Sequence, residues 1–175
     1  AVGQLLAQER DPERAAGLLR DDLRRTLGRR LGLGPDASLD ELLAAAERAI
    51  LERRPGTLVG MLHVHVRRLR QISIALDHEI ADALPGAVEE RLRAFLRSAD
   101  LVARIGEQDF MVVLPNLLSP GHAELAAQRV LREFERPLLV LGRLIEATVA
   151  LGLAWSPEHA GAADTLARRA TAALD

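Results

Sequence analysis

Short apolar runs alternate with longer amphipathic stretches along this chain, and this alternation restricts the possible folds more than any other feature. Runs rich in Val, Leu, Ile and Met predict strands at 58–66, 101–105, 110–114, 138–141 and 145–155. Helical spacing of apolar residues predicts helices at 38–53, 68–84, 85–98, 122–136 and 164–174. Strands interleaved with helices indicate an α/β (α+β) sandwich, with a central mixed, mostly antiparallel five-stranded sheet flanked by helices.

The first part of the chain has the pattern of a separate helical segment. An Asp-Pro-Glu start at 11–13 begins an amphipathic pattern that continues to about residue 30, and a Gly- and Pro-containing stretch at 31–36 interrupts it. Ser38 and Glu41 then form a capping-box pattern for the next helix. We therefore expect an N-terminal helical extension or linker at 1–37 and one domain at 38–175, taken from a longer parent protein.

Composition excludes several classes of function. The net charge of -2 provides no bulk attraction for nucleic acid or an anionic membrane, and 2% aromatic residues are too few for a base-stacking platform. The absence of cysteine excludes disulfides and thiolate chemistry, and no apolar run is long enough to span a bilayer. We expect a cytoplasmic domain that binds no nucleic acid and makes no direct membrane insertion in this segment.

One segment has a specific pattern: Arg97-Ser98-Ala99-Asp100, five mostly apolar residues, Gly106-Glu107-Gln108-Asp109-Phe110, and an apolar strand. It resembles the GGDEF family of diguanylate cyclase domains, in which Arg-x-x-Asp precedes a Gly-Gly-Asp/Glu-Glu-Phe hairpin tip at this spacing. The segment at 147–154 resembles the family's Thr-x-Ser-x-Gly strand, and 170–174 resembles its final helix. The resemblance extends from about residue 38 to the end of the chain and implies a nucleotide-cyclase-like fold.

The same resemblance implies that the cyclase active site is degenerate. Family members hold divalent metal with carboxylates at positions that match His65 and Gln108 here, and neither residue suits that ion. Glu107 replaces a glycine that lets the backbone approach the triphosphate. The degenerate active-site positions are His65, Ser73, Asp82, Gly106, Glu107, Gln108 and Asp109, and Arg70 matches a phosphate-binding lysine. We expect no enzyme activity, no catalytic residue, no metal and no cofactor.

The same resemblance also implies a binding site for cyclic di-GMP, the product of the family's cyclases. Arg97 and Asp100 match the family's Arg-x-x-Asp inhibitory site, the I-site, where the arginine binds a guanine edge and phosphate of an intercalated cyclic di-GMP dimer and the aspartate accepts guanine N–H groups. Arg129 matches a second arginine of that site. The chemistry is sound because a guanidinium pairs with guanine O6 and N7, and a carboxylate accepts from N1 and N2.

We therefore expect an inactive cyclic di-GMP receptor that regulates another domain of a parent protein or a secretion or motility partner. Family inference adds exopolysaccharide and biofilm control. Two alternatives remain open: a nucleotide-free scaffold that forms a homodimer or binds a protein, and a residual enzyme or GTP sensor.

His63, His65 and Asp109 also have ordinary structural interpretations. His63 and His65 lie two residues apart on one strand face, but two ligands without a third make a weak metal site, so structural roles are expected. Asp109 is expected to cap the hairpin turn.

Overall fold

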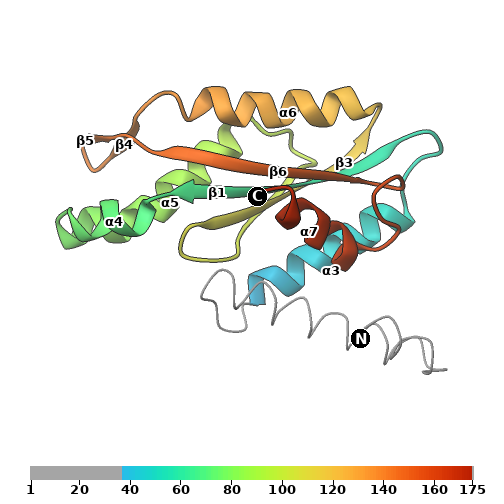
Figure 1. Ribbon diagram of the computed structural model, residues 1–175, viewed down its shortest axis with the longest axis horizontal. Helices are drawn as coiled ribbons and strands as arrows, with labels where there is room; N and C mark the ends of the chain where they lie inside the picture. Colours follow the sequence, from blue (N-terminus) through green and yellow to red (C-terminus); the bar gives the residue numbers. More distant parts are fainter. Residues whose placement is uncertain (1–36, 175) are drawn as a thin grey trace.

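The computed structural model describes residues 37–174. Four strands form one sheet in the order β2-β3-β1-β6, every neighbouring pair is antiparallel, and helices cover both faces (Figure 1). The elements in chain order are α3 (Ala37–Leu51), β1 (Leu58–Arg67), α4 (Leu69–Ile74), α5 (His78–Phe95), β2 (Leu101–Arg104), β3 (Asp109–Leu117), α6 (Pro120–Glu133), β4 (Leu138–Val140), β5 (Arg143–Ile145), β6 (Thr148–Ser156) and α7 (Ala163–Ala172).

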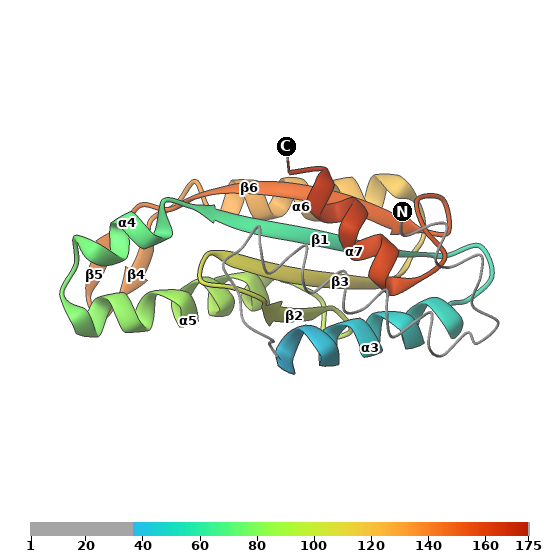
Figure 2. The same ribbon diagram turned by 60° about the horizontal axis from the view of Figure 1, so that its bottom comes forward.

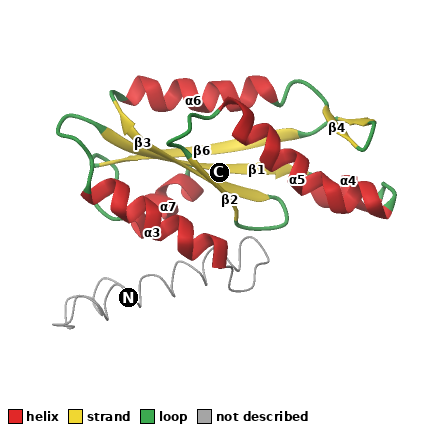
Figure 3. Ribbon diagram, turned by 180° about the vertical axis from the view of Figure 1, so that it is seen from behind, coloured by secondary structure: helices red, strands yellow, loops and turns green. Residues whose placement is uncertain are grey.

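The sheet separates two apolar cores. Helices α5 and α6 pack on one face and α3 and α7 on the other, as Figures 2 and 3 show from two further directions. Strand β1 is buried on both faces because Leu62, Val64 and Val66 point to the α5/α6 side, while Val59 and Met61 point to the α3/α7 side. The predicted α/β architecture, an antiparallel sheet flanked by helices, is confirmed.

The predicted five-stranded mixed sheet is wrong in its strand count. The strand predicted at 138–141 leaves the main sheet and pairs with β5 in a separate two-stranded hairpin. Leu141 and Gly142 both have positive φ, 48° and 83°, so the chain reverses within two residues. Such a turn joins β4 to its immediate neighbour and leaves a four-stranded antiparallel main sheet.

The predicted helix boundary at Pro85 is also wrong. Helix α4 ends at Ile74, and α5 continues through Pro85 to Phe95. Proline inside a helix costs roughly 3 kcal/mol because it lacks an N–H and its ring crowds the preceding turn. The buried stripe of α5 compensates, since Ile80 and Leu84 before Pro85 and Val88 and Leu92 after it lie in the same core.

Some of the predicted elements lie outside the residues that the structure describes. The helix predicted at about 11–30 and nearly all of the extension expected at 1–37 lie outside the described residues, as does the side chain of Ser38 in the expected capping box. Within residues 37–174, no helix is both long and apolar enough to cross a membrane.

Gly152 on β6 allows α7 to rest directly on the strand backbone. A Cβ at this position would lie 1.9 Å from the carbonyl oxygen of Ala170 and 3.0 Å from the amide nitrogen of Leu174. Gly152 is also the partner of His63 across the β1–β6 pair. This close approach brings Thr171 of α7 to His63.

Arg91 on α5 holds the end of α6 in place. Its Nη1 donates to the carbonyl oxygens of Glu133 and Arg136 at 2.8 and 2.9 Å, and its Nη2 donates to that of Pro137 at 2.8 Å. The last carbonyl groups of a helix have no partner within the helix, so a cation here satisfies them. Arg91 thereby fixes α6 relative to α5, and these two helices border the cleft described next.

Candidate ligand-binding site

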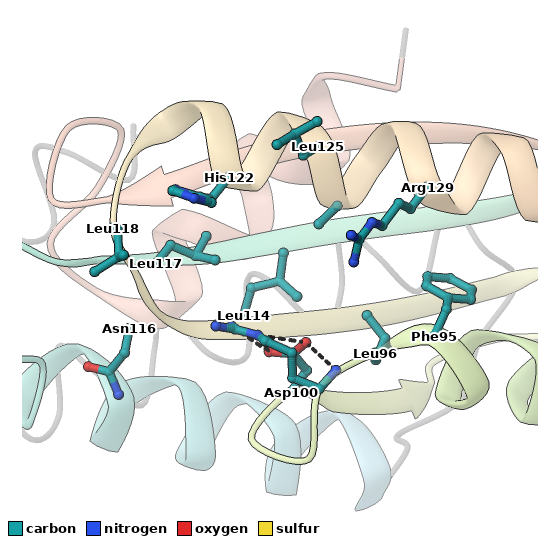
Figure 4. Close-up of a pocket in the computed structure, with 12 residues that line it drawn as sticks. Phe95, Leu96, Asp100, Leu114, Asn116, Leu117, Leu118, His122, Leu125 and Arg129 are labelled. Carbon is teal, nitrogen blue, oxygen red and sulfur yellow. Dashed lines mark hydrogen bonds and ion pairs between the residues drawn. The ribbon is translucent and has the colours of Figure 1, made fainter.

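A cleft of about 210 Å³ lies between α6 and the segment that joins α5 to β2, with β3 beneath it (Figure 4). Leu114 and Leu117 of β3 are buried and belong to its apolar lining. Arg97, Asp100 and Arg129, which the sequence singled out, all line this one cleft. The fold therefore brings together three residues that are separated by up to 32 positions in the chain.

Arg97 and Asp100 form a tight unit just after α5. The helix ends because Leu96 is extended, with φ −80° and ψ 154°, and a turn follows in which the Asp100 N–H donates to the Arg97 carbonyl at 3.0 Å. The Asp100 carboxylate accepts from the Arg97 backbone N–H at 2.9 Å, from Nε at 3.1 Å and from Nη2 at 2.7 Å. Nη2 also donates to the Pro115 carbonyl at 2.9 Å. These contacts fix the direction of the guanidinium.

The two partners differ in exposure. The Asp100 side chain is 3% exposed, whereas the Arg97 side chain is 50% exposed. Among the described residues, Nη1 of Arg97 has no hydrogen-bond partner, so its two N–H groups are available to a ligand. The buried carboxylate orients the cation, and the cation provides the accessible face of the pair.

Arg129 supplies a second cation from α6. Its side chain extends from the helix toward the interior of the cleft in Figure 4. Within residues 37–174 no ion pair engages Arg129. With two guanidinium groups and one buried carboxylate, the cleft has a local excess of positive charge that favours an anionic ligand.

The positions predicted to form a degenerate active site occupy a different part of the molecule. Ser73, Asp82 and Glu107 line a second cleft of about 360 Å³ together with Arg70 and Arg104. The other four positions lie on β1 or the β2–β3 hairpin and are absent from that lining: His65, Gly106, Gln108 and Asp109. The hairpin main chain is held by a bond from Arg104 Nε to the Gly106 carbonyl at 2.8 Å.

Asp109 is buried at the centre of a four-residue polar cluster. Its Oδ1 accepts from Nε2 of His63 and from Nδ1 of His65, both at 2.8 Å, while Nδ1 of His63 lies 2.9 Å from Oγ1 of Thr171. The side chains of His63 and Asp109 are 0% and 3% exposed. The structural interpretation of the histidines agrees with these contacts.

The expected turn-capping role of the Asp109 side chain is wrong. The main-chain carbonyl of Asp109 closes the hairpin by accepting from the N–H groups of Ile105 and Gly106 at 2.9 and 3.1 Å. The carboxylate instead points to β1, because Asp109 is the direct cross-strand partner of His65. Sequence reasoning missed Thr171 as a partner, since nothing local to 170–174 indicates contact with β1.

These residues do not suit a hard divalent cation. The imidazole of His65 replaces one expected carboxylate, and Gln108 presents an amide oxygen that accepts from the Arg70 N–H at 3.3 Å. The Asp109 carboxylate already accepts from two imidazoles. In the part of the chain that the structure describes, no group of three or more His, Asp or Glu residues could hold a metal ion.

Asp109→Ala is expected to lower the free energy of unfolding by about 2 kcal/mol, because it leaves two imidazole N–H groups without their acceptor. Asp82→Ala is the matched control: Asp82 is exposed, its contact with His78 is a surface ion pair, and its loss should change stability by less than about 0.5 kcal/mol. Urea unfolding of both variants measures the difference. Equal midpoints for the two variants would show that the cluster contributes no stability.

The cleft also contains residues that sequence reasoning did not single out. Leu118, His122 and Leu125 line it beside the three predicted residues. His122 and Leu125 precede Arg129 by seven and four positions, and residues at this spacing lie on one face of a helix. That periodicity is the signal that could have identified His122 and Leu125.

Comparisons with known proteins agree with the observed fold. Residues 37–175 match the sequence model of a family described as "Diguanylate cyclase, GGDEF domain". The diguanylate cyclase TpbB of Pseudomonas aeruginosa is 29% identical over 139 residues, which cover 73% of this chain and 32% of TpbB. The cyclic di-GMP phosphodiesterase NbdA of the same species is 28% identical over 122 residues, which cover 70% of this chain and 16% of NbdA. The chain thus spans less than a third of the length of either relative.

Solved structures show the same fold. The crystal structure of the GGDEF domain of Pseudomonas aeruginosa TpbB superposes with a TM-score of 0.72 at 26% identity, covering 77% of this chain and 85% of that domain. The GGDEF domain of DgcB from Caulobacter crescentus, solved in complex with c-di-GMP, has a TM-score of 0.65 at 18% identity, covering 81% of this chain and 90% of that domain.

Proposed function

Because the chain belongs to the GGDEF domain family, we propose that it is a catalytically inactive receptor that binds cyclic di-GMP in the cleft of Arg97, Asp100 and Arg129. GGDEF domains act in cyclic di-GMP metabolism and signalling, so a ligand of this class is expected. The observation that carries the proposal is the placement of two guanidinium groups in one cleft, one of them oriented by a buried carboxylate.

The proposed recognition uses charge-assisted hydrogen bonds. The free Nη1 of Arg97 donates to guanine O6 or N7, or to a phosphate oxygen, and Arg129 adds a second contact to the anion. Asp100 has a double role in this proposal: it orients Arg97, and its carboxylate accepts from the guanine N1 and N2 groups once the ligand displaces part of its present contact with Arg97. The buried leucines below provide an apolar surface for the sugar and base.

The residues at the degenerate active-site positions support binding without turnover. Metal-dependent phosphoryl transfer requires hard oxygen ligands that neutralise the developing phosphate charge. His65 and Gln108 stand where the family has metal carboxylates, and Glu107 places an exposed negative charge near the expected phosphates. Each replacement disfavours the binding of metal-bound triphosphate.

The proposed output is a change in contact with another domain or protein. The cleft borders α6 and the α5–β2 segment, so a bound ligand would present a composite surface of nucleotide and protein there. A domain of the same parent protein or a secretion or motility partner could recognise that surface. By family inference, the regulated process is exopolysaccharide production, biofilm formation or motility, and the ligand binds as an intercalated dimer.

Incubation of the chain with GTP and either Mg²⁺ or Mn²⁺ is expected to yield no cyclic di-GMP, because the carboxylates that would hold the metal are replaced. The GGDEF domain of TpbB, a diguanylate cyclase, is the matched positive control under the same conditions. Chromatographic detection of product measures both reactions. Repeated turnover by this chain would overturn the inactive assignment while leaving the cyclic di-GMP cleft open to separate measurement.

A further inference from the structure

We infer that the cleft contains a second subsite, formed by Leu118, His122 and Leu125. A cyclic dinucleotide has two bases, and this subsite packs against the flat face of the purine that does not pair with Arg97. We call these three residues the purine wall. The inference rests on the proposed function, because it assigns the second base of a cyclic dinucleotide to a place in the same cleft.

Two exposed leucines mark this wall. Leu118 and Leu125 are 72% and 55% exposed, although both line the cleft. The cleft lining continues from them to the buried side chains of Leu114 and Leu117. An apolar surface that is open to water in the free protein gains free energy when a flat ring covers it.

His122 lies between these leucines in the chain, and its ring is held in one orientation. Its Nδ1 lies 2.9 Å from Oγ of Ser119, the N-cap residue of α6, whose side chain makes no capping bond to the helix backbone. Figure 4 shows the imidazole on the cleft side of α6, near Leu118 and Leu117. A fixed imidazole offers a π-surface for stacking at little entropic cost, since Ser119 already restricts its rotation.

His122 of the wall and the cation Arg129 lie toward different ends of one face of α6. His122 and Arg129 are seven residues apart on α6, a separation of about 10 Å along the axis at 1.5 Å per residue. A ligand that uses both ends must join an anionic group to a flat heteroaromatic ring. Inorganic phosphate provides only the first, whereas a nucleotide provides both.

The chemistry of the wall predicts which base it accepts. Leucine side chains have no donor or acceptor, and Nε2 of His122 is the wall's one remaining ring nitrogen for a hydrogen bond. Stacking is tolerant of base identity because every base has a π-face. The wall should therefore accept adenine nearly as well as guanine, whereas Arg97 requires the O6 and N7 acceptors of guanine.

Titration calorimetry with three ligands tests this inference on the full chain. We expect 3′,3′-cyclic GMP–AMP to bind within about threefold of cyclic di-GMP, because its adenine lies on the wall, and cyclic di-AMP to bind at least about 30-fold more weakly. The double variant Leu118→Ala/Leu125→Ala should weaken cyclic di-GMP binding by about 10-fold. Leu131→Ala is the matched control, since Leu131 is also exposed on α6 but does not line the cleft.

The outcomes separate this inference from the proposed function. If cyclic di-GMP binds but cyclic GMP–AMP binds as weakly as cyclic di-AMP, both bases are recognised by their edges. The inference of a purine wall is then wrong, and the proposed receptor function is unaffected. The purine wall is also wrong, and the receptor again stands, if the double variant binds as tightly as Leu131→Ala. If cyclic di-GMP itself fails to bind the unmodified chain, both the proposed function and the purine-wall inference are wrong.

Discussion

Gly152→Ala is expected to lower the free energy of unfolding by roughly 3 kcal/mol or more and the melting temperature by roughly 10 °C. The added Cβ would meet the carbonyl oxygen of Ala170 at 1.9 Å. No rotamer change can relieve this clash, because the backbone of residue 152 fixes the Cβ and the oxygen is itself a backbone atom. Helix α7 must therefore move away from β6. That movement also separates Thr171 from His63, which adds the loss of a buried hydrogen bond.

Gly86→Ala is the matched control for this prediction, and it should have the opposite sign. Gly86 lies within α5, and a Cβ there meets nothing within 4 Å. Alanine in a helix interior is more favourable than glycine by about 0.5–1 kcal/mol, so this variant should be slightly stabilised. Thermal unfolding followed by circular dichroism compares the two. A Gly152→Ala variant as stable as Gly86→Ala would contradict the direct packing of α7 on β6.

Arg97→Ala is expected to weaken cyclic di-GMP binding by at least about 30-fold, because hydrogen bonds to charged groups contribute roughly 1.5–3 kcal/mol each and the substitution removes the accessible half of the Arg97–Asp100 pair. It also leaves the carboxylate of Asp100, which is 3% exposed, without its guanidinium partner. Arg97→Lys should restore only part of the affinity, since an ammonium group cannot form a planar fork.

Arg132→Ala provides the control for lost positive charge. Arg132 lies on α6 one turn beyond Arg129 and outside the cleft, so its removal should change affinity by less than about twofold. The melting temperature of each variant, measured without ligand, separates lost binding from lost folding. An Arg97→Ala variant that binds as well as Arg132→Ala would show that the ligand lies elsewhere.

Most of the architecture was accessible from the sequence because apolar periodicity is a local property. The strands of the main sheet and the order of the elements follow from it, as does the placement of helices on two faces. The course of α5 could not be obtained in this way. A proline is a local signal of helix termination, whereas the buried stripe that sustains α5 across Pro85 depends on tertiary contacts with the sheet.

The hairpin of β4 and β5 was missed for a related reason. Its turn places Leu141, a residue that disfavours positive φ, at a position where asparagine or glycine is usual. The sequence predicted a break after residue 141, but it gave no signal that β5 ends at Ile145 before β6 begins at Thr148.

The candidate functional residues were also predicted only in part from the sequence. Arg97, Asp100 and Arg129 were identified by family spacing, and the fold brings them to one cleft. The cluster around Asp109 was not foreseen, because its other members are far from Asp109 in the chain: His63 and His65, the partners of Asp109, come from β1, and Thr171, the partner of His63, comes from α7. Local reasoning assigned this carboxylate to the nearest turn, while strand register placed it in the interior.

Titration of cyclic di-GMP into the unmodified chain, followed by isothermal calorimetry, tests the central proposal most directly. We expect saturable binding with a dissociation constant below about 10 μM, which corresponds to roughly 7 kcal/mol, through Arg97 and Arg129. An absence of binding heat at ligand concentrations of tens of micromolar, with the chain shown to be folded in the same sample and the result repeated at a second temperature, would contradict the receptor function.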